Sequence, residues 1–409
     1  MIEAMIKVGI MIGGLMTAAA YFVLLERRMA AWVQDRIGPN RVGIPLTKIR
    51  LFGLGQPLAD GVKFIFKEEY TPAHVDKRLY ILAPISILAA ALAAFAVIPF
   101  GSMLPPFAIG PVEVKDKIDL VVAPGADIGM IYVFALSSIA VYGVILGGWS
   151  SNNKYSFLGG LRSSAQLIAY ELPMGLGILG VVLCAGSLNL EELITSQART
   201  GVWYAFAQPL GLIVFVIAAF AEAARLPFDL PECEQELIGG YHTEYAGLKL
   251  LLFLVAEFLH MITASFLIVM LFFGGWHFWG ITGPADGDIT WLHAIARIGV
   301  LNAKIFLVIL FFMLVRWSWP RFRFDQLMSL AWKVMLPLGI VNLVAVAIFE
   351  EVRRMYDPEG SSLVWALVGI VIAWVVCGLA WLVVAMTSPM VTDNRPQLAT
   401  HSYEVDSQI

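Results

Sequence analysis

Long, continuous runs of apolar residues alternate with polar segments along the whole chain. A helix needs about 20 apolar residues to cross the hydrocarbon of a bilayer, whereas membrane β-strands are shorter and alternate in polarity. Nine runs approach or exceed the helical length, at residues 8–25, 79–99, 127–148, 163–186, 202–222, 248–273, 300–317, 334–350 and 363–386. We therefore predict an all-α polytopic membrane protein with about nine transmembrane helices.

The composition indicates the same class. Of the 409 residues, 59% are hydrophobic and only 14% are charged, whereas charged residues make up about a quarter of ordinary soluble domains. This balance excludes a soluble enzyme. The net charge of -4 adds little, because most of such a chain faces lipid.

Lys and Arg predict the orientation of the chain in the membrane. Of the 27 basic residues, 19 fall in one alternating set of connectors and 7 in the other, while Lys304 lies inside a run. Positively charged loops stay on the cytoplasmic side. We expect the N-terminus outside and the C-terminus inside, which agrees with nine spans. No internal repeat of the transporter kind is visible in the sequence.

The segment from Glu222 to Glu244 is acidic and irregular, and it connects two apolar runs. Its one base is Arg225, and Pro227 and Pro231 interrupt any helix through its middle. Cytoplasmic connectors are normally basic, so these carboxylates must be paired, hydrated or engaged in proton exchange. The acids are Glu222, Asp229, Glu232, Glu234, Glu236 and Glu244.

Ionisable residues also fall inside the apolar runs. Glu171 lies near Pro173, and a charge at that depth costs about 2.5–3.5 kcal/mol on insertion scales, so we interpret it as a functional carboxylate. Glu257 and His260 share a helical face and form either a proton-exchanging pair or a structural hydrogen-bonded pair. Lys304 is a candidate partner for one of these carboxylates.

The connector at 26–78 opens with Glu26 and Arg28, which are either functional or simple snorkelling anchors. The following segment, "QDRIGPNRVGIP", carries Arg36 and Arg41. A loop rich in Gly and Pro exposes backbone amides and guanidinium groups, and both suit a protein partner or an anionic head group.

An amphipathic helix is predicted to begin near Pro57. Asp60, Lys63 and Lys67 share one of its faces, which is either the solvated side of an interfacial helix or a polar wall beside an apolar slot. A later segment, "VRWSWPRFRFDQLMSLAWKVMLP", is basic and aromatic. Its arginines are expected to face lipid phosphate, an acidic subunit or the acids of the 222–244 segment. They are Arg316, Arg321 and Arg323.

Cofactor motifs are missing from the sequence. The three cysteines and six histidines are scattered without ligand spacing, and neither a phosphate-binding loop nor a dinucleotide fingerprint occurs. We predict that this chain alone binds no metal, iron–sulfur cluster, haem or nucleotide. If the protein takes part in redox chemistry, the electrons come from another subunit.

Five ordered motifs together resemble the H subunit of proton-pumping NADH:quinone oxidoreductase, respiratory complex I. They are "RIGPNRVG", "GLGQPLADGVKFIFKE", "GWSSNNKYSFLGGLRSSAQLIAYELP", "AEAARLPFDLPECEQELIGGYHTEY" and "RFRFDQLMSLAWKVMLPL". The resemblance covers about residues 8–350. Members of that family usually have eight spans, so the run at 363–386 departs from the pattern. We expect a family domain at 1–350, an additional helix at 351–386 and a polar cytoplasmic tail at 387–409.

The resemblance implies roles for individual residues. The protein would form much of the quinone chamber, beneath the subunits that carry the terminal iron–sulfur cluster. Quinone contacts are implied for Glu26, Arg27, Arg36, Asp60, Lys63 and Phe228. A proton path is implied through Glu171, Glu222, Arg225, Asp229, Glu232, Glu234, Glu236, Glu244 and Glu257.

The resemblance also implies partners and a location. Quinone, either ubiquinone or menaquinone, would be the substrate, and NADH, FMN and iron–sulfur clusters would lie on partner subunits. Peripheral-arm subunits, small neighbouring membrane subunits and lipids would surround this chain, without nucleic acid. The location would be the bacterial inner membrane.

Three other functions would use some of the same features. Membrane-bound nickel–iron hydrogenases and ferredoxin- or F420-linked complexes carry a similar subunit, but the full acidic segment and the "GPNRVG" loop favour the quinone enzyme. A stand-alone ion channel or transporter would have no use for the large docking surface. A purely structural anchor gains nothing from ionisable groups in lipid.

Overall fold

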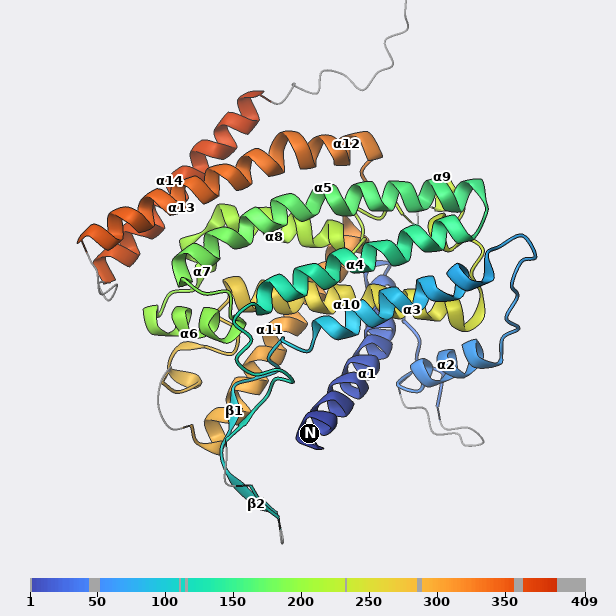
Figure 1. The fold of residues 1–409 in the computed structure, drawn as a ribbon, viewed down its shortest axis with the longest axis horizontal. Helices are drawn as coiled ribbons and strands as arrows, with labels where there is room; N and C mark the ends of the chain where they lie inside the picture. Colours follow the sequence, from blue (N-terminus) through green and yellow to red (C-terminus); the bar gives the residue numbers. More distant parts are fainter. Residues whose placement is uncertain are drawn as a thin grey trace, which may run out of the picture.

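The computed structural model describes residues 2–43, 52–109, 112–114, 117–231, 234–284, 289–356 and 363–387. Long helices lie side by side and make one bundle (Figure 1). The long helices of the bundle are α1 (Ile2–Val33), α3 (Lys77–Ala94), α4 (Gly129–Ser150), α5 (Lys154–Ala185), α10 (Gly247–Phe272), α11 (Trp291–Ser318), α13 (Leu336–Tyr356) and α14 (Leu363–Thr387). Shorter helices are α2 (Gln56–Phe66), α6 (Leu190–Thr200), α7 (Tyr204–Ala207), α8 (Pro209–Glu222), α9 (Glu234–Leu237) and α12 (Phe324–Ser329).

Eight helices of the described residues are long and apolar enough to span a membrane, which confirms the helical membrane class. The predicted run at 202–222 is the exception among the nine. It forms α7 and α8, and the 14 residues of α8 rise only about 21 Å. Its central residues Val214, Phe215, Ala218 and Ala219 are fully buried. The apolar run therefore reflects burial among other helices rather than full membrane-spanning length.

The predicted run at 334–350 belongs to a much longer helical stretch. Residues Phe324–Tyr356 form one 33-residue candidate span, in which the π-helical turn Leu330–Met335 joins α12 to α13. A π-turn accommodates an extra residue without ending the helix. The basic and polar residues at the start of this stretch concealed its length in the sequence pattern.

Two short antiparallel ladders qualify the all-α prediction. The connector between α3 and α4 contains β1 (Met103–Leu104) paired with β4 (Ile118–Asp119), with Met103 opposite Asp119. It also contains β2 (Phe107–Ile109) paired with β3 (Val112–Val114), with Ala108 opposite Glu113. The ladders project from the bundle at the end where α6 lies (Figure 1).

Caps and close helix contacts fix the bundle. Asp76 and Asn153 accept hydrogen bonds from the first free backbone amides of α3 and α5, respectively. Helix α8 packs against α5 and α10 and brings Glu222 into the interior. Helix α14 packs on α13, α7 and α8. The part of the predicted tail after Thr387 lies outside the described residues.

Candidate functional site

The segment that follows α8 is held in place through backbone atoms. The Gln166 side chain of α5 is fully buried, and its Nε2 donates to the carbonyl oxygens of Ala221 and Phe228, both at 2.8 Å. The backbone amide of Phe322 donates to the carbonyl oxygen of Pro227 at 3.2 Å. Buried backbone groups need such partners, so the residues between them are fixed relative to α5 and to the chain after α11.

Arg225 lies at the centre of a buried ion network. Its Nη1 is 3.2 Å from Glu26 Oε2 on α1, and its Nε is 3.0 Å from Glu257 Oε1 on α10. Its guanidinium also lies over the ring of Phe258, 4.3 Å from the ring centroid. Arg316 of α11 pairs with the other oxygen of Glu26. Four segments therefore meet through alternating charges, and the sequence did not predict this arrangement.

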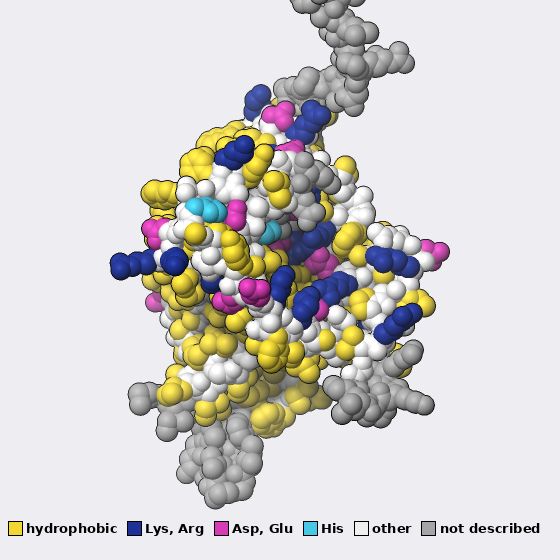
Figure 2. Space-filling view, turned by 90° about the vertical axis from the view of Figure 1, so that its right-hand side faces the viewer, with side chains coloured by type: hydrophobic (Ala, Val, Ile, Leu, Met, Phe, Trp, Pro, Cys, Tyr) yellow, Lys and Arg dark blue, Asp and Glu magenta, His cyan; other side chains and the backbone are white. Residues whose placement is uncertain are grey.

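An open cavity of about 810 Å³ lies beside this network. Glu26 lines it together with Arg27 and Arg36, Gln56 at the start of α2, and Trp317 of α11. Figure 2, which views the molecule from the α2 side, shows acidic and basic side chains gathered around a hollow in this face. Glu26 thus belongs both to the cavity wall and to the buried network.

Asp60 fixes α2 against α1 at the edge of this cavity. Its Oδ2 lies 2.6 Å from Arg27 Nη1, and its Oδ1 accepts from Gln56 Nε2 at 3.2 Å. Lys63 lies 3.8 Å from the same carboxylate. Helix α2 begins near Pro57, as predicted, and none of its residues is buried. Its apolar residues Leu58, Val62, Ile65 and Phe66 remain exposed.

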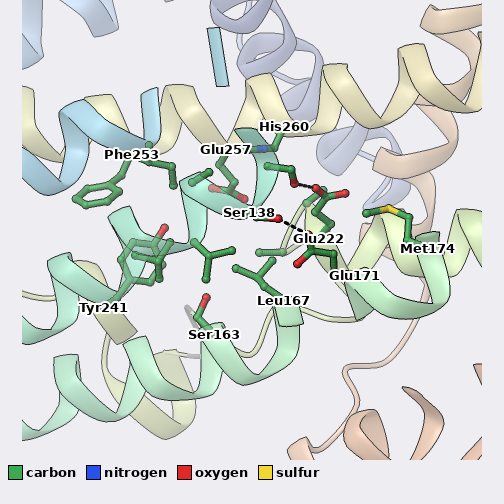
Figure 3. Close-up of a pocket in the computed structure, with 17 residues that line it drawn as sticks. Ser138, Ser163, Leu167, Glu171, Met174, Glu222, Tyr241, Phe253, Glu257 and His260 are labelled. Carbon is green, nitrogen blue, oxygen red and sulfur yellow. Dashed lines mark hydrogen bonds between the residues drawn. The ribbon is translucent and has the colours of Figure 1, made fainter. Parts of the chain in front are cut away.

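A second, smaller cavity lies on the other side of the network, and we name it the enclosed cavity for the helices around it, α3, α4, α5, α8 and α10. Its volume of about 50 Å³ exceeds the 10–15 Å³ that one water needs. Glu257 and His260 line it from α10, and Glu171 and Glu222 from α5 and α8 (Figure 3). Ser138 donates a hydrogen bond to Glu171 and Ser137 donates one to Glu222. The predicted shared face of Glu257 and His260 therefore points into a cavity that also holds two more carboxylates.

Asp229 forms a separate ion pair within the acidic segment. Its Oδ2 lies 3.2 Å from Arg321 Nη2, which confirms that an arginine after α11 faces these acids. Burial raises the pKa of Asp229 to about 6, and repulsion from Glu257 adds to this effect while the charge of Arg321 opposes it.

Several predicted site residues do not reach either cavity. Phe228 is buried between Tyr170 and Phe322, each with its ring centroid 5.5 Å away. Glu236 pairs with Arg162 at 2.7 Å, and Glu244 accepts from Asn153 Nδ2 at 2.6 Å. Glu232 lies outside the described residues, as does the side chain of Glu234.

The predicted carboxylate partner for Lys304 is wrong. The Lys304 ammonium donates to the backbone carbonyl oxygens of Phe273, Gly275 and His277, at 2.6, 3.0 and 2.7 Å. It also lies 4.5 Å from the ring centroid of Trp203. These carbonyls follow the C-terminus of α10, where backbone acceptors lack helical partners.

Sequence reasoning missed Ser137, Ser138 and the pairing of Arg316 with Glu26. The serines are small and lie within an apolar helix, where such residues usually serve helix packing. The two serines are adjacent in the sequence, and their position in α4 does not predict their carboxylate partners, which come from α5 and α8. Arg316 was expected to face lipid phosphate, an acidic subunit or the acids of the 222–244 segment, but it pairs with Glu26 of α1.

Comparison with known proteins identifies the family. Residues 6–347 match the family described as NADH dehydrogenase. The H subunit of NADH-quinone oxidoreductase from Protochlamydia amoebophila is 45% identical over 336 residues, which cover 82% of this chain and 94% of that protein. The H subunit from Leptospira biflexa serovar Patoc is 44% identical over 349 residues (85% of this chain, 93% of that protein). The first H subunit from Cytophaga hutchinsonii is 46% identical over 328 residues (80% and 90%).

These similarities extend over most of each chain and include every segment that contributes to the two cavities. The helices long enough to cross a membrane agree with a multi-pass protein. The chain therefore belongs to the family of H subunits of NADH-quinone oxidoreductase, as a membrane component of that enzyme complex, respiratory complex I.

Proposed function

We propose that the open cavity beside α1, α2 and α11 is the quinone chamber of the complex. Glu26, Arg27 and Arg36 supply charged groups and hydrogen-bond donors for a polar head group. The exposed apolar residues of α2 adjoin the chamber and suit a long isoprenoid tail that enters from the bilayer. Asp60 and Lys63 then act by orienting Arg27 and α2 rather than by lining the chamber.

The observation that carries this proposal is the position of Glu26. The Glu26 carboxylate lines the open cavity and pairs with Arg225. Arg225 pairs in turn with Glu257, which lines the enclosed cavity. A change of charge in the chamber would therefore alter the ion pairs that lead to the interior. No other contact between the two cavities is needed for this electrostatic link.

The enclosed cavity would hold and pass on protons. Glu171, Glu222 and Glu257 are carboxylates near one another, with room for water between them. Because like charges disfavour simultaneous ionisation, such groups share protons. Quinone reduction to quinol takes two electrons and two protons. We assign electron supply to iron–sulfur clusters of peripheral-arm subunits, and to this chain the binding of quinone and the movement of protons or charge away from it.

The orientation in the membrane follows the distribution of Lys and Arg. The face that carries α2 and α9 would lie on the cytoplasmic side of the bacterial inner membrane, under the peripheral arm. Two acids of the 222–244 segment would stabilise this face: Glu236 through its ion pair with Arg162, and Glu244 through its hydrogen bond with Asn153. The family domain at 1–350 would contain the whole site, without α14.

A photoreactive quinone tests the chamber assignment. The assembled complex in proteoliposomes would be illuminated with an azido-quinone, and the adducts would be located by mass spectrometry. We expect adducts among residues 26–42, at Gln56 or at Trp317, and we expect excess unmodified quinone to remove them. Competed adducts that fall only on α13 or α14 of this chain would exclude the proposed chamber.

A further inference from the structure

A third cavity lies beneath α14. Figure 1 shows α14 at the end of the bundle opposite α2. The volume of the cavity is about 120 Å³. Helix α14 supplies a wholly apolar wall. All polar side chains of the cavity lie on the opposite wall, called the polar wall here, where apolar residues such as Val346 and Phe349 stand beside them. The apolar wall is made by Trp365, Ala366, Gly369, Ile372, Ala373 and Val376. None of the groups proposed for quinone binding or for the enclosed cavity lies here.

The polar wall contains a nearly continuous strip of hydrogen-bonding groups. Arg353 donates to Glu350 Oε2 through Nε at 3.0 Å and Nη2 at 2.7 Å. Cys184 of α5 lines the same cavity as Glu350. Gln208 Nε2 donates to Cys184 Sγ and to the carbonyl oxygen of Gly180, both at 2.9 Å. The strip continues to Asn342, two turns of α13 before Glu350.

Two atoms of this strip lack partners within the described part of the chain. They are Oε1 of Gln208, a residue that is 1% exposed, and Nδ2 of Asn342, which is 4% exposed. A buried polar atom without a partner destabilises the folded protein. A lipid tail in the cavity would leave both atoms unsatisfied. Water can donate to Gln208 and accept from Asn342, and the cavity is large enough for several molecules.

We propose that this cavity is an aqueous port, defined as a chain of ordered waters along Cys184, Gln208, Asn342 and Glu350 that opens at the α6 end of the bundle. The waters hydrate Glu350 and let its carboxyl exchange protons with the aqueous phase on that side. This inference is independent of the proposed quinone chamber, which lies at the other end of the molecule.

Helix α14 seals the port from the bilayer. Its outer residues Val364 and Val371 are 67% and 63% exposed, as expected for a lipid-facing surface. A Cβ on Gly369 would lie 2.7 Å from the ring of Phe349, so α14 approaches α13 more closely than a larger residue would allow. Helix α14 therefore covers a wall whose polar groups lipid would otherwise contact.

Cysteine accessibility in the whole complex tests the port. In a background that carries Cys184→Ser, Cys233→Ser and Cys377→Ser, one cysteine would be placed on the cavity wall, as Ala345→Cys or Ala373→Cys. Matched controls are Val344→Cys and Val371→Cys, which face outward on the same two helices. A charged, membrane-impermeant methanethiosulfonate reagent should modify the wall positions at least about tenfold faster, because thiolates form where water reaches them.

Equal rates at wall and control positions, or modification of the wall positions only by an apolar maleimide, would overturn the port. A second measurement examines Glu350 itself with a water-soluble carbodiimide and an amine. We expect an adduct on Glu350 as well as on the exposed neighbour Glu351. Ala373→Trp would fill part of the cavity, so it should slow the modification of Glu350 but not that of Glu351. An adduct confined to Glu351 would show that Glu350 has no aqueous access.

Discussion

Arg225 Nε lies 3.0 Å from Glu257 Oε1, although the arginine follows α8 and the glutamate lies in the middle of α10. The arginine is only 4% exposed, and its Nη1 lies 3.2 Å from Glu26 Oε2. Together with Arg316, which also pairs with Glu26, the network sets two cations against two carboxylates, and the loss of any one charge leaves a buried charge uncompensated. Any event that changes the charge on one carboxylate must therefore change the interaction of Arg225 with the other.

Arg225→Met should destabilise the protein strongly. It leaves Glu257 without its cation, and breaking one partner from a buried pair costs about 3–5 kcal/mol. Arg225→Lys should recover only part of this loss, because one ammonium cannot match the two-sided geometry of a guanidinium. Thermal inactivation of NADH:quinone activity measures the effect, with the exposed Arg354→Lys as control. Equal stability of Arg225→Met and wild type would contradict the buried network.

Glu222→Gln and Glu171→Gln should separate proton pumping from quinone reduction. Glutamine can still accept the serine hydrogen bond from α4, but it cannot release a proton. We expect proton translocation per NADH to fall severalfold while uncoupled quinone reduction persists. The exposed Glu192→Gln on α6 serves as control. Normal pumping in both variants would remove the enclosed cavity from the proton path.

Much of this site could be predicted from the sequence as a set of residues, but less as a set of contacts. The period of a helix was enough to place Glu257 and His260 on one face, and both line the enclosed cavity. The Glu26–Arg225 pair joins residues 199 positions apart, and no local pattern encodes such a meeting. The sequence therefore predicted which carboxylates belong to the cluster, but not which residues they contact.

Lys304 shows why the remaining errors arose. A lysine inside an apolar run predicts a carboxylate partner, but the Lys304 ammonium donates its hydrogen bonds to the backbone carbonyls after α10 instead. Gly274 and Gly275 have φ of +70° and +52°, which turns the chain and leaves these carbonyls available. Likewise, the apolar run at 202–222 cannot reveal whether its residues face lipid or other helices.

The pH dependence of stability should contain a contribution from Asp229. Its pKa is raised from 3.8 to about 6 by burial and by Glu257. The folded protein therefore binds the proton more tightly, and stability falls as pH rises from about 4 through 6. Asp229→Asn cannot ionise and should remove this fall, which is at most about 3 kcal/mol. Thermal inactivation at pH 5 and 7 measures it, with the exposed Asp325→Asn as control. An unchanged pH dependence in Asp229→Asn would contradict the assignment.

Lys304→Met should destabilise the chain at the end of α10 without a direct effect on quinone binding. Three backbone carbonyl oxygens would lose their donor, and each unsatisfied buried group costs about 1–3 kcal/mol. We expect a lower thermal midpoint together with an unchanged KM for quinone in the surviving enzyme. Lys154→Met, at an exposed position, is the control. A raised KM at an unchanged midpoint would instead connect Lys304 to the quinone chamber.

Gly159→Ala should displace the end of the acidic segment. An added Cβ at Gly159 would lie 2.7 Å from the backbone of Gly240 and Tyr241, and backbone cannot move aside as a flexible side chain can. Overpacking of this kind costs about 1–3 kcal/mol. Gly175, in the same helix, has no atom within 4 Å of the corresponding Cβ, so Gly175→Ala is a matched control that should be neutral or stabilising.

The two glycine variants differ in what they report about function. Because Tyr241 lines the enclosed cavity, its displacement in Gly159→Ala should reduce pumping per NADH as well as the thermal midpoint. Gly175→Ala should leave pumping unchanged and should not lower the thermal midpoint, since the added methyl group contacts nothing. A loss of stability in Gly159→Ala with full coupling would mean that the acidic segment serves only to hold the bundle together. A loss of both stability and pumping would indicate that the position of the acidic segment affects proton movement by the carboxylates of the enclosed cavity.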